Sequence, residues 1–159
     1  MNAPTPFLEC SFPGQNVAAV VELLAVAAPL TCQTLLGRLP INTDTYHTKW
    51  NVGEIFTILP PFPTQPPESL TSEVQPGNVV VFHYAGSYRA ATAHLRAAEL
   101  GDYTELGFFY RPMVRADGPA GPVQGTRIGR IVDGLAALAE AARTMRQTGF
   151  VAMLIRQHG

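Results

Sequence analysis

Hydrophobic residues along this chain occur in short runs, most of which end at a proline or a glycine. Short runs rich in β-branched and aromatic residues predict β-strands. Residues 45–59, with the sequence TYHTKWNVGEIFTIL, predict extended structure with a hairpin turn near Asn51 to Gly53. Further predicted strands cover residues 6–12, 78–84, 103–111, 126–132 and 150–156.

Two segments predict helices. Between residues 133 and 149, apolar side chains recur at positions 135, 138, 142 and 145, which is helical spacing. Asp133 is placed to cap the first turn, and Gly149 suits a left-handed helix end. Residues 29–40 predict a shorter helix that begins and ends at a proline. Residues 17–28, VAAVVELLAVAA, fit either a strand or a helix.

Two stretches rich in proline and glycine, residues 60–77 and 113–125, predict surface loops. Proline has no amide hydrogen to donate, so the first stretch cannot pair in the interior of a sheet. Long loops in compact domains often carry function. Many short strands, two helices and few strand–helix–strand alternations indicate a mainly β fold, a closed or nearly closed barrel with helices at its ends. We expect residues 1–159 to form a single domain.

Charged residues are scarce, at 14% of the chain, against roughly 25% in a typical soluble domain. A surface with few solvated charges leaves apolar area uninterrupted, so we expect a homo-oligomer. The alternative is a compact monomer with a polar, uncharged surface. The net charge of −1 comes without a basic block or stripe, which argues against a nucleic-acid partner.

The chain shows no feature that predicts a membrane or an exported protein. The longest apolar segment, residues 16–30, is interrupted by Glu22 and Pro29 and is too short for a membrane span. The first stretch, MNAPTPFLECSF, lacks the basic start and apolar middle of a signal peptide, so we expect a cytoplasmic location. Cys10 and Cys32 match no redox or metal spacing, and we expect both to be small buried hydrophobic residues.

Motifs that hold metals or cofactors are missing from the sequence. No HxH, HExxH or paired-cysteine spacing occurs, and His94 and His158 do not join a ligand cluster, so no metal site is expected. No glycine-rich phosphate loop or nucleophile elbow occurs either, and we expect no cofactor.

Five stretches, taken in order, carry a resemblance to a known family. This chain resembles the small bacterial proteins of unknown function that have a cyclophilin-like barrel. The resemblance implies a closed barrel of roughly eight strands, flanked by helices, and it implies that residues 17–28 begin as a strand leading into the helix at Pro29. The stretches are AAPLTCQTLLGRLP, YHTKWNVGEIFTI, PPESLTSEVQPGNVVVF, YTELGFFY and GPVQGTRIGRIVDGLAALAEAARTMRQTG.

The family pattern also marks single residues. A histidine and a tryptophan precede a glycine–glutamate pair, which matches His47, Trp50 and Glu54. A glutamate ahead of a proline–glycine turn matches Glu68, and one at the start of the following strand matches Glu105. The chain departs from the pattern around Thr126 and Arg127 and again at Tyr110 and Arg111, changes that would alter the ligand while keeping the barrel.

True prolyl isomerases share this barrel. The site of prolyl isomerases resembles an arginine and a phenylalanine-rich pocket in a fixed order. No segment of this chain aligns with it. Since a fold does not carry a function by itself, we do not expect prolyl isomerase activity.

Three residues are candidates for catalysis: His47, Glu54 and Glu105. Histidine changes charge near neutral pH, so His47 is either a titratable group beside a pocket or a hydrogen-bonded residue of the barrel rim. Glu54 and Glu105 each lead an apolar strand. If either points into the barrel mouth, desolvation would raise its pKa and make it an acid or a base. The alternative is an exposed carboxylate at a strand end.

Four residues are candidates for ligand binding. We expect Trp50 to lie in the core or in the wall of a pocket, because large aromatic residues dominate both. Glu68 lies in the long loop, either as part of a lid over a pocket or as a solvated charge. Tyr84 and Phe82 share one face of their strand, opposite Val81 and His83. Arg127 is one of several arginines that offer a guanidinium to a carboxylate, together with Arg89, Arg111 and Arg115.

These residues leave three functions open. The first is a protein that binds a small carboxylate or amide at the barrel rim, between the two proline-rich loops. The second is an enzyme that acts on such a compound and uses His47 with Glu54 or Glu105 as acid and base. The third is a non-catalytic subunit of an oligomeric complex.

Overall fold

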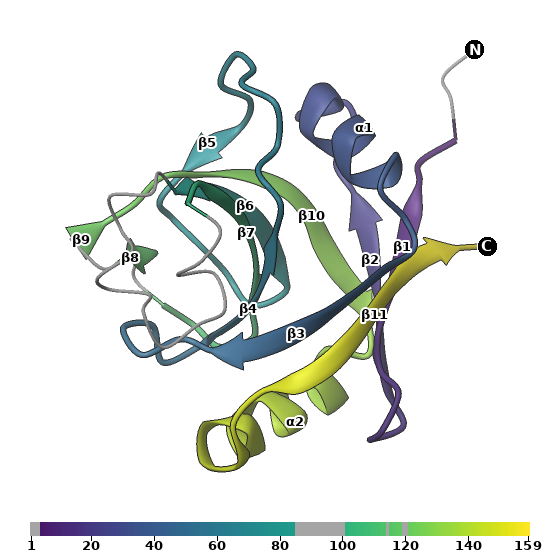
Figure 1. Ribbon diagram of the computed structural model, residues 1–159, viewed down its shortest axis with the longest axis vertical. Helices are drawn as coiled ribbons and strands as arrows, with labels where there is room; N and C mark the ends of the chain where they lie inside the picture. Colours follow the sequence, from purple (N-terminus) through teal and green to yellow (C-terminus); the bar gives the residue numbers. More distant parts are fainter. Residues whose placement is uncertain (1–3, 85–100, 114, 119–120) are drawn as a thin grey trace.

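Figure 1 shows the computed structural model, which describes residues 4–84, 101–113, 115–118 and 121–159. Eight antiparallel strands close into a barrel in the order β2-β1-β11-β3-β4-β7-β6-β10, and β10 pairs back to β2. The predicted fold class, a mainly β closed barrel with two helices, is confirmed. The strands are β1 (Phe7–Phe12), β2 (Val17–Leu23), β3 (Ile41–His47), β4 (Glu54–Leu59), β6 (Asn78–Tyr84), β7 (Tyr103–Phe109), β10 (Gly125–Asp133) and β11 (Val151–His158).

The apolar run that fitted either a strand or a helix begins as a strand. β2 pairs with β1, and Ala19, Val21 and Leu23 point into the core while Glu22 points outward. After a turn the chain continues into α1 (Pro29–Leu36). The resemblance had implied this arrangement, and alternation of inward and outward side chains explains it.

The two helices lie at different ends of the barrel, α1 beside β2 and α2 (Leu135–Thr148) below β3 and β11 in the view of Figure 1. Leu35 of α1 and Leu138 and Met145 of α2 pack into the same main core as the inward side chains of the strands. The helices therefore close the ends of the barrel with apolar surface. Cys10 and Cys32 are buried in this core as predicted, and burial raises the pKa of both thiols to about 12.

The predicted cap of α2 is wrong by one residue. Asp133 is still part of β10, where it pairs with Val20, and its side chain makes no cap hydrogen bond. The N-cap is Gly134, whose φ of 79° is left-handed and whose added Cβ would lie 2.2 Å from the Ala18 carbonyl oxygen. A residue without a side chain is required where the chain turns this closely against β2.

A second, smaller core covers the outside of the barrel. Outward side chains of β4, β7 and β6, including Phe56, Phe82 and Phe109, pack against Val74 and Ala116 from the two predicted loops. The Ala116 amide donates to the Ser72 carbonyl at 2.7 Å, which joins the loops to each other. The loops contain three two-residue strands, namely β5 (Leu70–Thr71) on the edge of β10, and β8 (Asp117–Gly118) paired with β9 (Gly121–Pro122).

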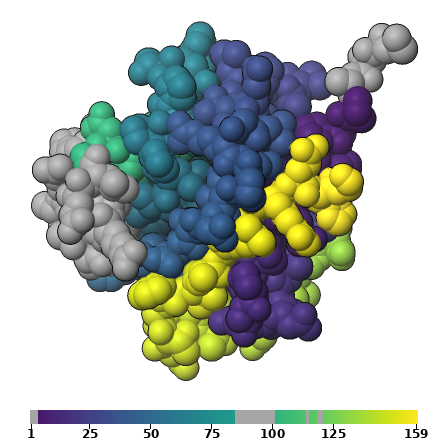
Figure 2. Space-filling view, turned by 45° about the vertical axis from the view of Figure 1, so that its right-hand side comes forward, coloured from purple at the N-terminus to yellow at the C-terminus, as the bar shows by residue number. Residues whose placement is uncertain are grey.

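The first and last strands of the chain, β1 and β11, lie side by side on the barrel. Figure 2 shows the C-terminal strand in yellow beside both the purple N-terminal residues and the blue segment around α1 and β3. This agrees with the pairing of β11 with β1 on one side and β3 on the other. Among the residues that the structure describes, no helix is long and apolar enough to span a membrane.

Candidate functional site

Glu54 and Glu105, here called the carboxyl pair, point outward from neighbouring strands of the barrel. In the register of β4 and β7, Glu54 lies opposite Phe109, Phe56 opposite Gly107, and Ile58 opposite Glu105. Alternation places all of these side chains on one face. The proline- and glycine-rich loops cover this face, so Glu54 is only 1% exposed and Glu105 only 5%.

Gly107 lets the two carboxyl groups approach each other. A Cβ atom added at this position would lie 2.5 Å from Glu54 Oε1. The Glu54 carboxyl group therefore leans across Gly107 toward Glu105, two residues earlier on the same face of β7. An isolated glycine inside a strand often marks such a close approach.

Asn51, in the turn between β3 and β4, contacts one member of the carboxyl pair, Glu54. Its side-chain Nδ2 donates to Glu54 Oε2 at 2.5 Å and to the Asp117 carbonyl at 2.7 Å, and its Oδ1 accepts from the Asp117 amide at 3.1 Å. Asn51 is itself buried, and its backbone amide donates to the Thr48 hydroxyl oxygen at 2.7 Å. One buried amide thus ties the turn, the second loop and the carboxyl group together.

Burial makes at least one member of the carboxyl pair a neutral acid near pH 7. Desolvation raises the pKa of Glu54 to about 8, against the opposing effect of its hydrogen bonds with Asn51 and Glu105. Desolvation also raises the pKa of Glu105 well above its ordinary value, and the nearby charge of Glu54 adds to this effect. Glu54 Oε1 has no partner of good hydrogen-bond geometry among the described groups. The hydrogen bond between the side chains of Glu54 and Glu105 requires a proton on one of the two carboxyl groups.

His47 does not join the carboxyl pair. It lies opposite Ile55 on the inward face of β3, whereas Glu54 and Glu105 are on the outward face of the same sheet. Its Nδ1 is 2.8 Å from the Thr48 carbonyl oxygen and its Nε2 is 2.8 Å from the Tyr110 hydroxyl. The arrangement brings the two predicted glutamates together and separates the predicted histidine from both.

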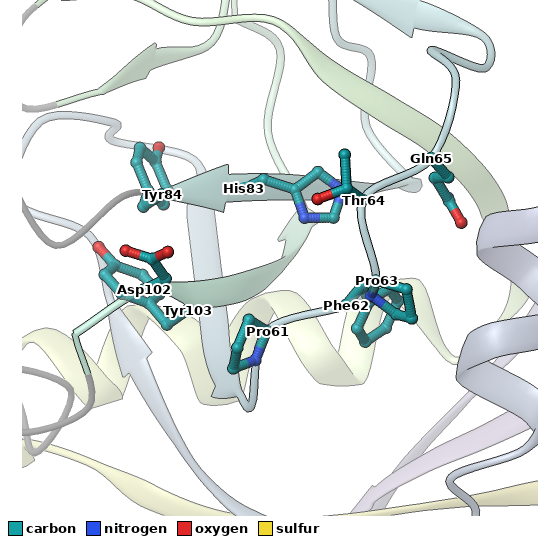
Figure 3. Close-up of a pocket in the computed structure, with 9 residues that line it drawn as sticks. All are labelled: Pro61, Phe62, Pro63, Thr64, Gln65, His83, Tyr84, Asp102 and Tyr103. Carbon is teal, nitrogen blue, oxygen red and sulfur yellow. The ribbon is translucent and has the colours of Figure 1, made fainter.

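A pocket of about 360 Å³, here called the proline-loop pocket, lies at the barrel rim where β6 ends and β7 begins. One wall is the segment from Pro61 to Gln65 in the first proline-rich loop. The other wall consists of His83 and Tyr84 from β6 with Asp102 and Tyr103. Figure 3 shows Tyr84, Asp102 and Tyr103 grouped on one side, and His83, Thr64 and Gln65 on the side nearer α1.

Arg38 fixes the proline-rich wall of this pocket. Its guanidinium donates to the carbonyl oxygens of Pro60 at 2.7 Å and Pro61 at 2.9 Å, and it lies 4.5 Å from the centre of the Phe62 ring. The Phe62 amide donates to the Thr104 hydroxyl at 2.8 Å. The wall is therefore held in place without a ligand, which lowers the entropic cost of binding one.

The polar groups of the proline-loop pocket are mostly uncharged. Partial burial lowers the pKa of His83, so its imidazole is neutral at about pH 7. Its Nδ1 lies 3.3 Å from the Thr104 hydroxyl. Gln65 is oriented by a hydrogen bond from its side-chain Nε2 to the Thr31 hydroxyl at 2.5 Å. Neutral donors and acceptors thus surround a largely apolar space.

The predicted ligand-binding residues are dispersed in the structure. Tyr84 lines the proline-loop pocket. Trp50 is half-buried in the turn between β3 and β4, and Arg127 is exposed on β10; neither lines that pocket. Arg89, considered above as a carboxylate-binding residue, and His94, considered as a metal ligand, lie outside the described residues.

Glu68, for which the sequence left a lid residue or a solvated charge open, contacts the start of α1. Its Oε1 accepts from the Leu30 amide at 2.9 Å, and its Oε2 accepts from the amide and hydroxyl of Thr31 at 2.9 and 2.8 Å. The helix needs this distant cap because the N-cap residue is Ala28, which has no polar side chain. Desolvation alone would raise the pKa of Glu68, but these three hydrogen bonds together hold it below its ordinary value.

Residues that matter most for this geometry were not candidates from the sequence. Asn51 and Gly107 build the carboxyl pair, and Arg38 and Phe62 build the proline-loop pocket. A glycine between Glu105 and Phe109 in an otherwise apolar strand was the one local sign of a close approach. Arg38 and Phe62 depend on partners far away in the sequence, and Asn51 joins the nearby Glu54 to the distant Asp117.

The fold belongs to the class of cyclophilin-like barrels. Over 96% of the chain, it is similar to the solved structure of McbB in complex with tryptophan, with a TM-score of 0.67 and 14% identity. Over 98% of the chain, it is similar to the Mimivirus cyclophilin, with a TM-score of 0.53, 10% identity and 89% of that chain covered. The chain spans 45% of the McbB chain, which is less than half of it.

Residues 10–155 match the model of a family described as "Protein of unknown function (DUF3830)". The chain belongs to this family. The predicted resemblance to a cyclophilin-like family of unknown function is thereby confirmed. No curated protein sequence matches the chain.

Proposed function

We propose that this protein binds a small organic amide in the proline-loop pocket at the barrel rim. The observation that carries this proposal is a pocket of about 360 Å³ whose walls are held in place by Arg38 and Thr104. Its volume lies in the range of small-molecule sites. A preformed apolar space with a few fixed polar groups is the usual form of such a site.

The charge of the pocket favours an amide over a free carboxylate. His83 is neutral near pH 7, and Gln65 and Thr64 offer uncharged donors and acceptors. Asp102 is the one acidic residue among the lining residues and would repel a carboxylate. The rings of Phe62 and Tyr103 favour a ligand with an aromatic or other apolar body.

The test is binding of indole-3-acetamide compared with indole-3-acetate, measured by thermal shift and isothermal titration calorimetry. The indole ring is chosen because the similar McbB structure contains tryptophan. We expect the amide to bind at least about tenfold more tightly than the acid, and His83→Ala to weaken it by about tenfold, through loss of a hydrogen bond and of ring contact. His158→Ala, at an exposed histidine on β11, is the control. Equal binding of amide and acid, or no effect of His83→Ala, would contradict the proposal.

The carboxyl pair favours a second candidate, an enzyme that hydrolyses such an amide. Tyr103 precedes Glu105 by two residues on the same face of β7, and its ring lies 5.2 Å from that of Tyr84, so Glu105 is next along this face from two residues of the pocket wall. Two carboxyl groups that hold one proton between them supply an acid and a base. Release of ammonium from indole-3-acetamide is the assay. Binding that survives Glu105→Gln while turnover is lost would favour the enzyme, and absence of turnover in the parent protein would rule out this substrate class.

We also propose that the protein is a homo-oligomer. The low charged fraction of 14% supports this, as do exposed apolar side chains at Val26, Val52 and Phe150, which are 99%, 52% and 60% exposed. Light scattering at micromolar concentration is expected to give a multiple of 17.1 kDa. A single species of 17.1 kDa would contradict the oligomer, and failure of every tested compound to stabilise the protein would favour a non-catalytic subunit of a complex.

A further inference from the structure

We propose that the opposite end of β4 carries a separate binding site for a small organic carboxylate with an apolar body. The site is a pocket of about 370 Å³, here called the α2-end pocket. It lies between two segments of the chain. One is the end of β3 with the following turn, from Tyr46 to Lys49, and the other is the end of α2 with the residues just before β11, from Met145 to Phe150. It shares no lining residue with the proline-loop pocket.

The α2-end pocket is lined by two basic residues and by no acidic residue. Lys49 is on the turn, Arg146 is in the last turn of α2, and both side chains are exposed. Arg111 is close enough to affect the charge of His47, as Arg146 is. Glu140 of α2 does not line the pocket and is paired with Arg143 at 2.7 Å. The C-terminal end of α2 carries partial negative charge, which Arg146 offsets, and the remaining positive charge favours an anion.

The geometry favours an organic carboxylate over a bare inorganic anion. The rings of Tyr46 and Phe150 lie 5.9 Å apart at the pocket, and Phe150 is 60% exposed. An apolar ligand body covers this aromatic surface, which a phosphate ion cannot do. Lys49 on the turn and Arg146 on α2 both line the pocket, so we expect one carboxylate group to bind between them.

His47 can add a third positive charge without breaking its hydrogen bonds. Because the Thr48 carbonyl only accepts, the proton of neutral His47 is on Nδ1, and Nε2 accepts from the Tyr110 hydroxyl. When His47 is protonated, Nε2 donates to the Tyr110 oxygen instead. Tyr110 then donates to the Val52 carbonyl at 3.2 Å. Both ring nitrogens remain occupied, so His47 acts on a ligand through its charge.

The first test uses benzoate, with benzamide of the same shape as the neutral comparison, on the full chain at low salt. Calorimetry and amide NMR shifts are the measurements. We expect benzoate to shift residues 46–49 and 145–150, and to bind at least about tenfold more tightly than benzamide. Arg146→Gln and Lys49→Gln are each expected to weaken the binding of benzoate by about fivefold or more. Arg156→Gln, at an exposed arginine on β11, is expected to leave the affinity for benzoate unchanged. Added salt weakens the interaction.

The second test follows the charge of His47. Partial burial, together with Arg146 and Arg111, lowers its pKa in the free protein despite the Thr48 carbonyl. Bound benzoate is expected to raise that pKa, as seen by NMR, and binding therefore tightens as pH falls from about 7 to 5.5. His47→Gln removes this pH dependence and keeps the NMR footprint. Tyr110 and Lys49 also face His47, and burial raises the pKa of Tyr110 further away from this range.

Several results would overturn the site. They are equal binding of benzoate and benzamide, unchanged affinity in both Arg146→Gln and Lys49→Gln, or NMR shifts that fall on the proline-loop pocket. Inorganic phosphate that binds as tightly as benzoate would show a site without selectivity for an organic body and would also contradict the proposal. His83→Ala is expected to leave benzoate binding unchanged, so this site and the amide site fail or succeed independently.

Discussion

Replacing Glu105 by glutamine is expected to stabilise the protein at about pH 8 and to remove most of the loss of stability between about pH 5 and pH 8. In the parent protein, the free energy of unfolding should fall over this interval by about 2–4 kcal/mol more than in Glu105→Gln. The glutamine has nearly the same shape as the glutamic acid. It donates a permanent hydrogen bond to the Glu54 carboxylate, where the parent protein depends on a proton.

The direction follows from the raised pKa values of the carboxyl pair. Unfolded glutamates ionise near the ordinary value of 4.5, whereas folded Glu54 ionises only near pH 8 and Glu105 is also raised. Between these values the folded protein holds more protons than the unfolded chain, so stability falls as pH rises, by at most about 1.4 kcal/mol per pH unit for each proton. Below about pH 4.5 the burial of two neutral acids carries no such cost.

Chemical denaturation at a series of fixed pH values measures this effect. His47 and His83, whose pKa values are lowered, act in the opposite direction near pH 6 in both proteins, so the difference between parent and variant isolates the carboxyl pair. Glu73→Gln, at an exposed glutamate in the first loop, is the matched control and should follow the parent. Parallel pH profiles for the parent and Glu105→Gln would show that the two carboxyl groups do not share a proton.

Gly107→Ala is expected to destabilise the protein by about 2–4 kcal/mol, which is large for the addition of one methyl group. The added Cβ would lie 2.5 Å from Glu54 Oε1 and 3.4 Å from an atom of the Phe82 ring. The Glu54 carboxyl would have to leave its position between Asn51 and Glu105. A buried group that loses its partners costs their hydrogen bonds as well as the steric strain.

A double-mutant cycle with Glu54→Ala separates the carboxyl contact from general crowding. If the contact with Oε1 dominates, Gly107→Ala costs much less in a protein that already carries Glu54→Ala. Gly14→Ala is the control, because a Cβ added there meets no atom within 4 Å, and its effect should stay within about 0.5 kcal/mol. An equal cost of Gly107→Ala in both backgrounds would assign the effect to Phe82 instead.

The carboxyl pair and the two pockets occupy different parts of one sheet. The α2-end pocket lies where β3 ends and the proline-loop pocket where β4 ends, while the pair is on the outer face between them. Buried acids with raised pKa values are common at functional sites, although structural networks produce them too. The pH profile of Glu105→Gln and the amide assay therefore answer different questions about the same two residues.

Local patterns in the sequence were sufficient for most of the secondary structure. The strands β6 and β7 and the helix α2 follow from apolar runs and helical spacing, because these depend on neighbours only a few residues away. The cap of α2 was missed by one residue for the opposite reason. Whether β10 continues through Asp133 depends on its pairing with β2, more than a hundred residues earlier in the chain.

The sequence by itself determined that this protein is a mainly β barrel with two helices, and it identified Glu54 and Glu105 as candidate catalytic residues. Only the tertiary structure decided that these glutamates meet across Gly107, that Glu68 caps α1, and that His47 lies on the other face. Alternation fixes which side chains share a face of a strand. Which strands become neighbours, and in what register, is set by packing of the whole barrel, and a shift of one residue would reverse every face.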